Sequence, residues 1–436
     1  MIYERENETR SREDMEQLQI ERLQTTMHRV YRNVAFYRHS FDSCGVNIER
    51  IKSINDLAFL PFTTREDLLK SYPYDMFAVP LRDIVRIHST SGTTGKPIIV
   101  GYTRNDINIW TSLVTRVLAA AGITNHDFIQ IAFKYNLFTG GFGFHYGAEK
   151  IGASVIPAST EDVEKQITIM KDYKTTVLVS TPGYALHIAV VLKELNIHPE
   201  ELFLRTGLFG AEPWSENLRT QIEESLHIKA YDNYGLTEII GPGVAFECEK
   251  QCGLHINEDH FIPEIIDPET LETLPEGERG ELVFTTITKQ GFPLIRYRTG
   301  DISSIVSEPC QCGRTLARME RVSGRTDDMI IVEGINVFPS QIEEVLLRIE
   351  GIEPHYQITL DRKEGVDTME IMVEVEEEFF SDETKILENL RERIEREISS
   401  HLGIGAEITL VEPKKISRST GGKLKHVIDR RDVLSK

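Results

Sequence analysis

A stretch rich in hydroxyl and glycine residues near residue 90 has the composition of a phosphate-binding loop. Between His88 and Lys96 the chain carries serines, threonines and two glycines, whose backbone N–H groups can point at phosphate oxygens. It is not a Walker A loop, because Thr90 occupies the position of the first glycine and Pro97 follows Lys96. The loop therefore predicts a phosphate-binding site. The alternative is a flexible surface turn.

Three more short motifs could act on the same kind of ligand. Glu238 directly follows Thr237, and a carboxylate beside a hydroxyl can hold Mg²⁺ when substrate phosphates complete its shell. Asp301 follows a glycine and could accept hydrogen bonds from a ribose diol. Lys423 follows two glycines almost at the end of the sequence. Taken alone, the first two motifs also fit an ordinary turn, and the third also fits a solvated tail.

The five cysteines are too few for a disulfide scaffold in a chain of 436 residues. Four of them form two close pairs, and a histidine follows the first pair. Soft and borderline ligands in two short clusters fit a closed tetrahedral zinc site. The alternative is a set of reduced thiols with an ordinary histidine. The residues concerned are Cys248, Cys252, His255, Cys310 and Cys312, whereas Cys44 stands apart.

Composition limits the classes of function. Lys plus Arg is 49 and Asp plus Glu is 69, so the formal charge is 49 − 69 = −20, which disfavours nucleic acid and anionic membranes as partners. Hydrophobic residues make up 40% and charged residues 27%, as in ordinary globular proteins. No apolar run approaches the roughly 20 residues of a membrane span, and the first residues are polar. A cytoplasmic location is therefore expected.

The periodicity of apolar residues predicts an α/β protein. One helix is expected over residues 12–37, and helices alternate with strands over residues 98–210, which indicates a largely parallel sheet covered on both faces. Residues 255–306 indicate a small antiparallel β unit. After a change of composition at residues 324–328, an α+β set follows. We therefore expect a large N-terminal domain (1–326) and a small C-terminal domain (327–436). The strands expected are 128–133, 153–156, 177–180, 202–209, 261–266, 280–286 and 302–306.

The motifs, in this order, resemble those of the adenylate-forming superfamily of acyl- and aryl-CoA synthetases. Within it, the chain is similar to the phenylacetate–CoA ligase family in four further tracts, and the similarity covers nearly the whole sequence. The resemblance implies a large adenylate-forming domain with mixed sheets and a small, mobile α+β lid. The four tracts are Tyr135–Glu149, Phe209–Trp214, Glu258–His260 and Asn336–Gln341.

The resemblance implies that ATP converts an aryl-acetic acid to its acyl-AMP with release of pyrophosphate, and that coenzyme A then displaces AMP. Glu238 would bind Mg²⁺, Thr237 would contact the α-phosphate, Asp301 would hold the ribose, and Arg325 would lie near ribose or phosphate. The β- and γ-phosphates would be covered by Ser91, Gly92, Thr93, Thr94, Gly95 and Lys96. The rest of the nucleotide would contact Gly210, Ala211, Glu212, Pro213, Asp232, Asn233, Tyr234 and Gly235.

In the C-terminal domain, the resemblance assigns the adenylation lysine to Lys423. The motif has one extra residue compared with the family, so Lys425 is the fallback. Asp327 would be the hinge about which the domain swings between the two reactions. Gly334 would let the pantetheine arm of CoA approach the backbone closely.

The acid pocket implied by the resemblance is aromatic, aliphatic and glycine-rich, which suits a flat ring on a short carboxylate arm. Its glycines would leave room for the ring; the alternative is an ordinary glycine-rich connection between strands. The residues are Tyr135, Phe138, Gly140, Gly141, Phe142, Ala148, Ile239, Ile240 and Pro242. Relatives that carry cysteine clusters imply a structural zinc on Cys248, His255, Cys310 and Cys312, with Cys252 as a spare thiol or substitute ligand.

Two other functions remain open at this point. An enzyme of the same fold could use another carboxylic acid, or pass the acyl or nucleotidyl group to an acceptor other than CoA. A non-catalytic, zinc-stabilised nucleotide-binding module is the second alternative, although such a module has no use for Lys423. The family resemblance also implies that a homodimer can form.

Overall fold

The computed structural model describes residues 1–90, 96–160, 162–326, 330–332, 335–363, 366–376, 384–416 and 427–430. The chain divides into two compact units. The first contains Met1–Ala211 and Ile222–Arg321, and the second contains Glu212–Gln221 and Val322–Lys436. Each unit is described by itself below. The domain boundary between residues 326 and 327 stays a prediction.

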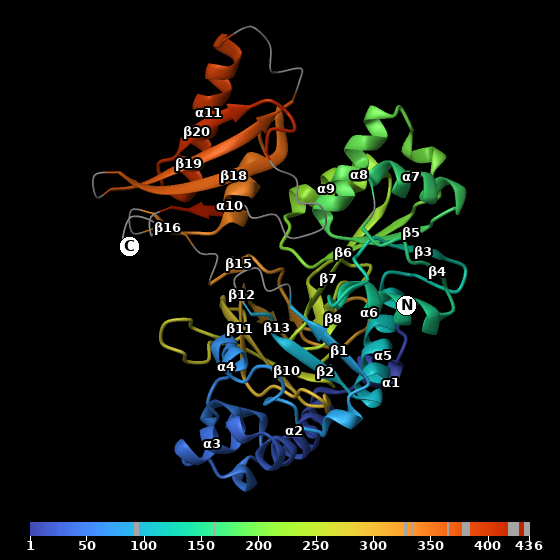
Figure 1. The fold of residues 1–436 in the computed structure, drawn as a ribbon, viewed down its shortest axis with the longest axis vertical. Helices are drawn as coiled ribbons and strands as arrows, with labels where there is room; N and C mark the ends of the chain where they lie inside the picture. Colours follow the sequence, from blue (N-terminus) through green and yellow to red (C-terminus); the bar gives the residue numbers. More distant parts are fainter. Residues whose placement is uncertain are drawn as a thin grey trace. The chain divides into compact units, whose positions relative to one another are not determined.

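A nine-stranded sheet organises the first unit, in the order β13-β14-β9-β8-β7-β6-β5-β3-β4 (Figure 1). Strands β4, β3, β5, β6 and β7 are parallel, whereas β8, β9, β14 and β13 continue the sheet antiparallel. The strands are β3 (Phe128–Ile131), β4 (Ser154–Ile156), β5 (Val177–Ser180), β6 (Thr206–Gly210), β7 (Lys229–Leu236), β8 (Gly241–Phe246), β9 (Leu254–Ile256), β13 (Ile305–Val306) and β14 (Arg318–Met319).

The strand order decides where the helices lie. From β3 the chain crosses outward to β4 through α6, then returns past β3 to β5 through α7 and continues to β6 through α8. Since such crossovers are right-handed, α6 must cover the face opposite to α7 and α8. In agreement, α5 packs against α6, and α7 packs against α8. The helices are α5 (Arg104–Ala120), α6 (Gly140–Ile151), α7 (Val163–Asp172), α8 (Pro182–Glu194) and α9 (Glu216–Leu226).

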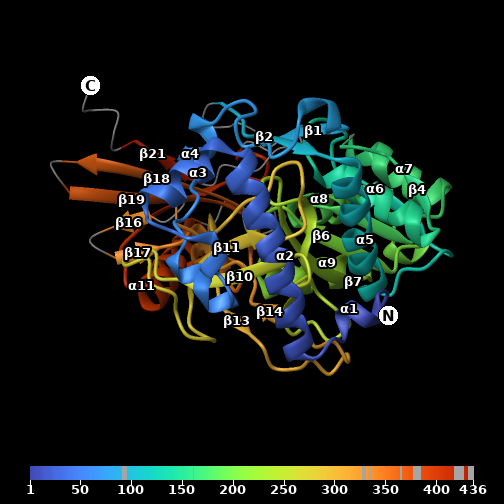
Figure 2. The same ribbon diagram turned by 90° about the horizontal axis from the view of Figure 1, so that it is seen from below.

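The first unit also contains the antiparallel pair β1-β2 and, in a different sheet, the antiparallel strands β10, β11 and β12. Its N-terminal part is a group of helices, of which α2 is the long dark-blue helix in Figure 2. No helix in the described part of the chain is both long and apolar enough to cross a membrane. These elements are β1 (Arg86–Ser89), β2 (Ile99–Tyr102), β10 (Phe261–Ile266), β11 (Gly280–Thr286), β12 (Tyr297–Ser303), α1 (Arg5–Glu8), α2 (Arg12–Asn33), α3 (Ala35–Ser43) and α4 (Arg65–Lys70).

Several expected elements differ in their bounds. The helix expected over residues 12–37 is broken at Val34, whose extended φ of −113° separates α2 from α3, while the Asn33 side chain donates to the Ala78 carbonyl at 3.0 Å. The strand expected from residue 202 begins only at Thr206, as β6. The expected strand 302–306 is divided between β12 and β13. The strands expected at 177–180, 261–266 and 280–286 have those bounds in the structure.

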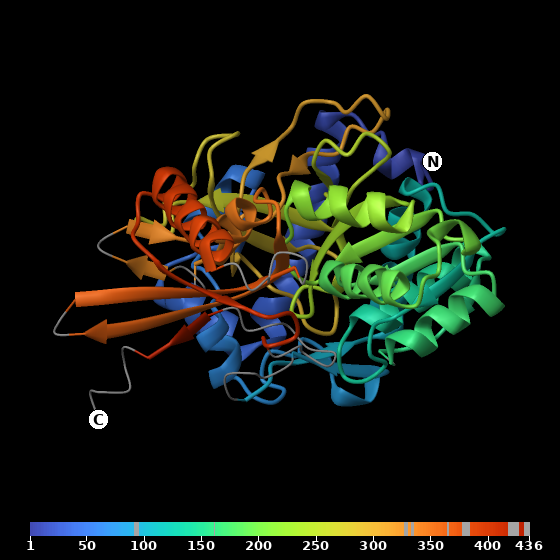
Figure 3. The same cartoon turned by 90° about the horizontal axis from the view of Figure 1, so that it is seen from above.

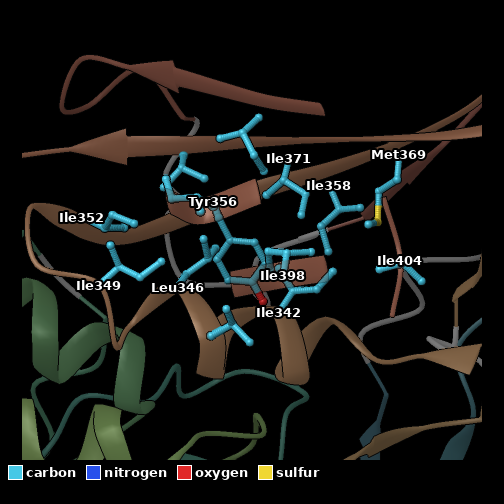
Figure 4. Close-up of a cluster of buried hydrophobic side chains, with 14 of the residues drawn as sticks. Ile342, Leu346, Ile349, Ile352, Tyr356, Ile358, Met369, Ile371, Ile398 and Ile404 are labelled. Carbon is cyan, nitrogen blue, oxygen red and sulfur yellow. The ribbon is translucent and has the colours of Figure 1, made fainter. Parts of the chain in front are cut away.

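The second unit is built on a four-stranded sheet in the order β20-β19-β18-β21, whose long orange hairpin and red helix are visible in Figure 3. Ile342 of α10, Ile371 of β19 and Ile398 of α11 are each fully buried in one apolar cluster (Figure 4). The elements are β15 (Gly324–Arg325), β16 (Ile330–Val332), β17 (Ile335–Val337), α10 (Pro339–Leu346), β18 (Ile352–Lys363), β19 (Val366–Val375), α11 (Thr384–Leu402), β20 (Glu407–Val411) and β21 (Val427–Asp429). The α/β fold class expected from the sequence is confirmed.

A buried cluster of charges ties the N-terminal segment to the large sheet. The fully buried Arg116 of α5 donates two hydrogen bonds of 2.8 Å to the two carboxylate oxygens of Asp259, and it also contacts Glu4. Burial alone would raise the pKa of Asp259, but the neighbouring His260 and Arg116 hold that pKa well below its ordinary value. Arg12 donates to the adjacent Glu258 at 2.8 Å. The family-like tract Glu258–His260 is therefore a structural anchor.

We predict that Arg116→Met lowers the free energy of unfolding by about 3–5 kcal/mol, because it leaves the buried Asp259 carboxylate without its bidentate partner. Urea unfolding followed by circular dichroism measures this. Arg82→Ala is the control, since Arg82 and Asp83 form an exposed pair, and we expect a change within about 0.5 kcal/mol. A loss below about 1 kcal/mol for Arg116→Met would contradict the role of this pair.

Candidate functional site

The expected nucleotide and acid residues gather at the carboxyl ends of neighbouring parallel strands. The connection after β3 leaves for one face of the sheet and the connection after β5 leaves for the other, which is the kind of topological switch point where α/β sheets bind ligands. The tract Tyr135–Phe142 follows β3, Gly210 and Ala211 stand at the end of β6, and Asp232–Leu236 forms the last part of β7. Topology alone therefore places three of the expected tracts at one edge.

Two neighbouring strands approach so closely that glycine is required where the adenine is expected. A Cβ on Gly210 would lie 2.3 Å from the carbonyl oxygen of Asn233, and one on Gly235 would lie 1.9 Å from that of Gly241. The Asn233 amide donates to the Phe209 carbonyl at 2.7 Å and holds β6 and β7 in this register. Ala211 has a left-handed φ of 70°, which a residue with a side chain rarely adopts. Close backbone contacts and the Asn233 hydrogen bond therefore constrain the backbone where the adenine is expected.

Asp301, the residue expected to hold the ribose, contacts Tyr234 of the expected adenine site. The Tyr234 hydroxyl donates to the Asp301 carboxylate at 2.6 Å, although the two residues lie 67 positions apart. Asp301 lies within β12, after Gly300 with a φ of 77°, and not in the plain turn that the sequence also allowed. Asp232 faces the Arg321 guanidinium at 3.5 Å. Both carboxylates are therefore in place for a polar ligand at this edge.

The Thr237–Glu238 motif meets the start of the expected acid tract. The hydroxyl oxygens of Thr139 and Thr237 are 3.1 Å apart in a buried hydrogen bond. Glu238 is half-buried, and its carboxylate lies 3.5 Å from the Tyr297 hydroxyl. A single carboxylate beside a hydroxyl fits Mg²⁺, which keeps water and phosphate oxygens for most of its shell. Thr237 and Glu238 directly follow β7, which ends at Leu236.

A buried lysine that was not singled out from the sequence donates hydrogen bonds to the backbone of this motif. Lys289 is 2% exposed, and its ammonium donates to the carbonyl oxygen of Ile239 at 2.6 Å and to that of Glu238 at 3.4 Å. It also lies 4.5 Å from the ring centroid of Tyr102, whose hydroxyl donates to the Ile240 carbonyl at 3.0 Å. Three consecutive carbonyls are thereby fixed. No local pattern marked it, because Thr288 and Gln290 flank Lys289 as in an ordinary polar turn.

The turn that carries Lys289 is itself held by Asp106. The Asp106 carboxylate accepts hydrogen bonds from the backbone N–H groups of Gln290 at 2.7 Å and Gly291 at 2.8 Å, and it caps the start of α5. Burial lowers the pKa of Lys289 to about 7, while the carboxylates of Asp106 and Glu238 act in the opposite direction. The lysine therefore titrates near neutral pH.

Aromatic side chains from three segments line the expected acid tract. The rings of Tyr135 and Phe142 meet edge-on with centroids 5.2 Å apart, and His88 of β1 contacts Phe142 at 5.6 Å. Burial lowers the pKa of His88 to about 4, so its ring is neutral at pH 7 and Nδ1 donates to the Leu137 carbonyl at 3.0 Å. The Arg86 guanidinium lies 5.2 Å from the centre of the Phe142 ring. Neither Arg86 nor His88 was singled out from the sequence as an acid-site residue.

The glycines of this tract do not leave open space. A Cβ on Gly143 would lie 2.6 Å from Pro242 and 2.8 Å from Trp110, and one on Gly141 would lie 3.2 Å from the Lys134 carbonyl. A Cβ on Gly140 would meet the Phe138 ring at 2.5 Å. Pro242 and Trp110 thus fill the space on the Cβ side of Gly143, and the expectation that glycines of this tract make room for a substrate ring stays a prediction. Ala148, Ile239 and Ile240 are fully buried.

Several expected residues cannot be placed in this site. Ser91, Gly92, Thr93, Thr94, Gly95, Asp327, Gly334, Lys423 and Lys425 lie outside the described residues. Strands β1 and β2 pair on either side of residues 91–95, and the Lys96 ammonium lies 5.5 Å from the ring centroid of Tyr72. Arg325 lies in β15 of the second unit, and Glu212 and Pro213 belong to the segment grouped with that unit.

Four expected metal ligands lie together at the antiparallel end of the nine-stranded sheet. The ligand atoms of Cys248, His255, Cys310 and Cys312 all lie within 4.8 Å of one another. The sulfurs of Cys248 and Cys310 are 3.8 Å apart, and Cys312 Sγ is 3.4 Å from His255 Nε2. A tetrahedral zinc site with Zn–S near 2.3 Å requires spacings of about 3.8 Å between sulfurs and about 3.5 Å from sulfur to nitrogen. The donor set therefore fits zinc in chemistry, and these two donor pairs also fit it in spacing.

Comparison with known proteins identifies the family. Residues 15–288 match the family described as AMP-binding enzyme, and residues 334–431 match the AMP-binding enzyme C-terminal domain. A phenylacetate-coenzyme A ligase of Thermus thermophilus is 46% identical over 99% of this chain and 100% of the relative. The chain belongs to the phenylacetate-coenzyme A ligase family of AMP-binding enzymes. The family resemblance of the sequence is thereby confirmed.

A second relative and a solved structure are also similar to this chain. The phenylacetate-coenzyme A ligase of Escherichia coli strain K12 is 44% identical over 98% of this chain and 97% of the relative. A crystal structure of 2-hydroxyisobutyryl-CoA ligase in the postadenylation state superposes with a TM-score of 0.92, covering 99% of this chain and 92% of that chain at 27% identity. The chain is therefore an adenylate-forming ligase with both family domains.

We predict that Lys289→Met removes a pH dependence of stability. The folded pKa of about 7 lies below the ordinary 10.5, so between these values the unfolded chain binds more protons and wild-type stability rises with pH. Relative to Lys289→Met, the wild-type free energy of unfolding should therefore increase from pH 7 to pH 9. Urea unfolding at both pH values measures it. A difference between the two proteins that stays constant with pH would refute the buried, titrating lysine.

Proposed function

We propose that the protein activates phenylacetate, or a closely related aryl-acetic acid, as its acyl-AMP and transfers the acyl group to coenzyme A. The observation that carries this proposal is the buried hydrogen bond between Thr139 and Thr237, because it joins the aromatic tract to the Mg²⁺- and phosphate-binding motif. A ligand ring packed on Tyr135 and Phe142 would lie in the same tract as Thr139, whose hydroxyl contacts that of Thr237. The names of the relatives supply the substrate, and the aromatic lining supports it.

Charge development explains the roles proposed for the polar residues. Attack of a carboxylate on the α-phosphate of ATP gathers negative charge on phosphate oxygens, which cationic and N–H donors stabilise. We assign Mg²⁺ to Glu238, where it would neutralise phosphate charge when bound. Thr237 would donate to the α-phosphate, and Asp301 with its partner Tyr234 would hold the ribose hydroxyls. Lys289 and Tyr102 keep the backbone of this motif in place.

The residues outside the described ranges complete this proposal from the family resemblance. Lys423 would bridge the carboxylate and the α-phosphate during adenylation, and residues 91–96 would cover the β- and γ-phosphates. Asp327 would be the hinge between domains 1–326 and 327–436, and Gly334 would line the path of the pantetheine arm. A homodimer and a cytoplasmic location, expected from the sequence, stay predictions.

We further propose that Cys248, His255, Cys310 and Cys312 hold a structural zinc ion. The spacing of their ligand atoms supports a closed four-ligand site. The Arg314 guanidinium donates to Cys312 Sγ at 3.5 Å, and a positive charge beside three thiolates would stabilise them. Arg314 also pairs with the buried Glu8 at 2.6 Å, so the ion would lock the N-terminal segment onto the sheet.

We predict a steep preference for aryl-acetic acids. With ATP and CoA, phenylacetate should give thioester with a kcat/KM at least about tenfold above that of a straight-chain acid of similar size, since a flat ring fills the aromatic tract. Thioester formation across a panel of acids measures this. Equal rates for aryl and straight-chain acids would contradict the proposed pocket, and pyrophosphate release without thioester would point to another acceptor.

We predict that Lys423→Ala reduces phenylacetate-dependent exchange between ATP and pyrophosphate by roughly 10²–10³-fold, because one charge-stabilising donor is lost. Thioester formation from separately supplied phenylacetyl-AMP and CoA should change little. Lys425→Ala is the matched control and should keep nearly full exchange. The opposite pattern, with loss in Lys425→Ala alone, would move the role to Lys425.

A further inference from the structure

A fifth thiol lies directly beside the proposed zinc ligands. Cys252 Sγ is 3.5 Å from Cys310 Sγ, and Cys252 is exposed whereas Cys310 is buried. The ligand group of four mutually close donor atoms does not include Cys252. Since a structural zinc site closes with four ligands, the fifth thiol is left outside the shell yet in contact with one member of it.

The backbone around Cys252 holds this arrangement in place. Gln251 and Gly253 have left-handed φ values of 48° and 95°, and the Gln251 amide donates to the Ala230 carbonyl at 2.7 Å. The guanidinium of Arg318, in β14, donates to the carbonyl oxygen of Cys252 at 2.5 Å and to the Cys252 sulfur at 3.1 Å. The thiol is therefore fixed beside Cys310 by contacts on both sides of the turn.

We propose that Cys252 is a redox modification site that controls zinc retention by forming a disulfide with Cys310. This inference rests on the zinc site proposed above. An exposed thiol in contact with a second sulfur is the arrangement in which oxidation leads to a disulfide. To form the disulfide, the Sγ–Sγ distance must shorten from 3.5 Å to about 2.05 Å.

The chemistry needs a peroxide as the oxidant. The Cys252 thiol attacks the peroxide, the O–O bond breaks, and a sulfenic acid and one molecule of water or alcohol are formed. The Cys310 thiolate then attacks the Cys252 sulfur, the S–O bond breaks, and hydroxide leaves as the disulfide forms. Cys310 can no longer serve as an anionic ligand, so zinc retains only Cys248, Cys312 and His255.

Loss of zinc would affect the ligase site through the pairing of strands β8 and β7. Cys248 lies two residues after the end of β8, and β8 pairs with β7 through Phe246 opposite Asn233 and Ala245 opposite Tyr234. Asn233 and Tyr234 are the residues that fix the register of the nucleotide wall. Oxidation should therefore lower ligase activity, and reduction in the presence of zinc should restore it.

The test treats purified, zinc-loaded protein with hydrogen peroxide and follows released zinc with a chromogenic chelator. We expect one zinc ion per chain to leave as a Cys252–Cys310 disulfide appears in peptide mass spectra. Cys252→Ser should release zinc about tenfold more slowly and form no such disulfide. The matched control is Cys44→Ser, which changes another exposed cysteine and should behave like the wild type.

Zinc release from Cys252→Ser at the wild-type rate would overturn the proposal, as would a disulfide that joins Cys310 to Cys248 or Cys312. Protein that contains no zinc but still forms the Cys252–Cys310 disulfide would support the modification site and overturn the control of zinc. Absence of CoA thioester from untreated, zinc-loaded protein would reject the ligase assignment separately, because neither the zinc nor the disulfide measurement depends on that reaction.

Discussion

Parallel strands of one sheet can be joined only by connections that cross a face of the sheet, and here those connections reverse direction between β3 and β5. Helix α6 must therefore leave on one face while α7 and α8 occupy the other. Of the residues assigned to the adenylate, Gly210 and Ala211 stand at the carboxyl end of β6, and Asp232–Gly235 form the last part of β7. The aromatic tract follows β3, and the nucleotide wall follows β6 and β7. The site is a consequence of this topology.

Buried polar contacts fix the backbone at the carboxyl ends of these strands. The carbonyls of residues 238–240 would be free to shift if apolar packing alone held them, but Lys289 and Tyr102 each donate to them directly. Asp106 orders the turn that supplies Lys289 and begins the helix beneath it. Farther out, Arg116 and Asp259 bind the N-terminal segment to the same sheet. Each group is buried and partnered, which is the condition under which polar groups specify one arrangement.

Local patterns predicted much of this structure, and their failures have a common cause. The strand over residues 261–266 and the parallel arrangement of β3, β5 and β6 follow from apolar runs and the helices between them. Asp301 was weighed as a plain turn because its place in β12 depends on pairing with β11. The break at Val34 and the carbonyl contacts of Lys289 likewise depend on distant partners. Such tertiary pairing overrides local preference and cannot be deduced from spacing.

The motif order and family likeness identified the candidate ligands, whereas geometry explained why they belong together. Thr139 and Thr237 lie 98 positions apart, and no periodicity links them, yet their hydroxyls meet. Adenylation is the claim on which the other assignments depend. Phenylacetate labelled with oxygen-18 in its carboxylate tests it directly: with ATP and CoA, one label should appear in the phosphate of AMP for each thioester formed. Label in pyrophosphate, or thioester formed with unlabelled AMP, would contradict an acyl-AMP intermediate.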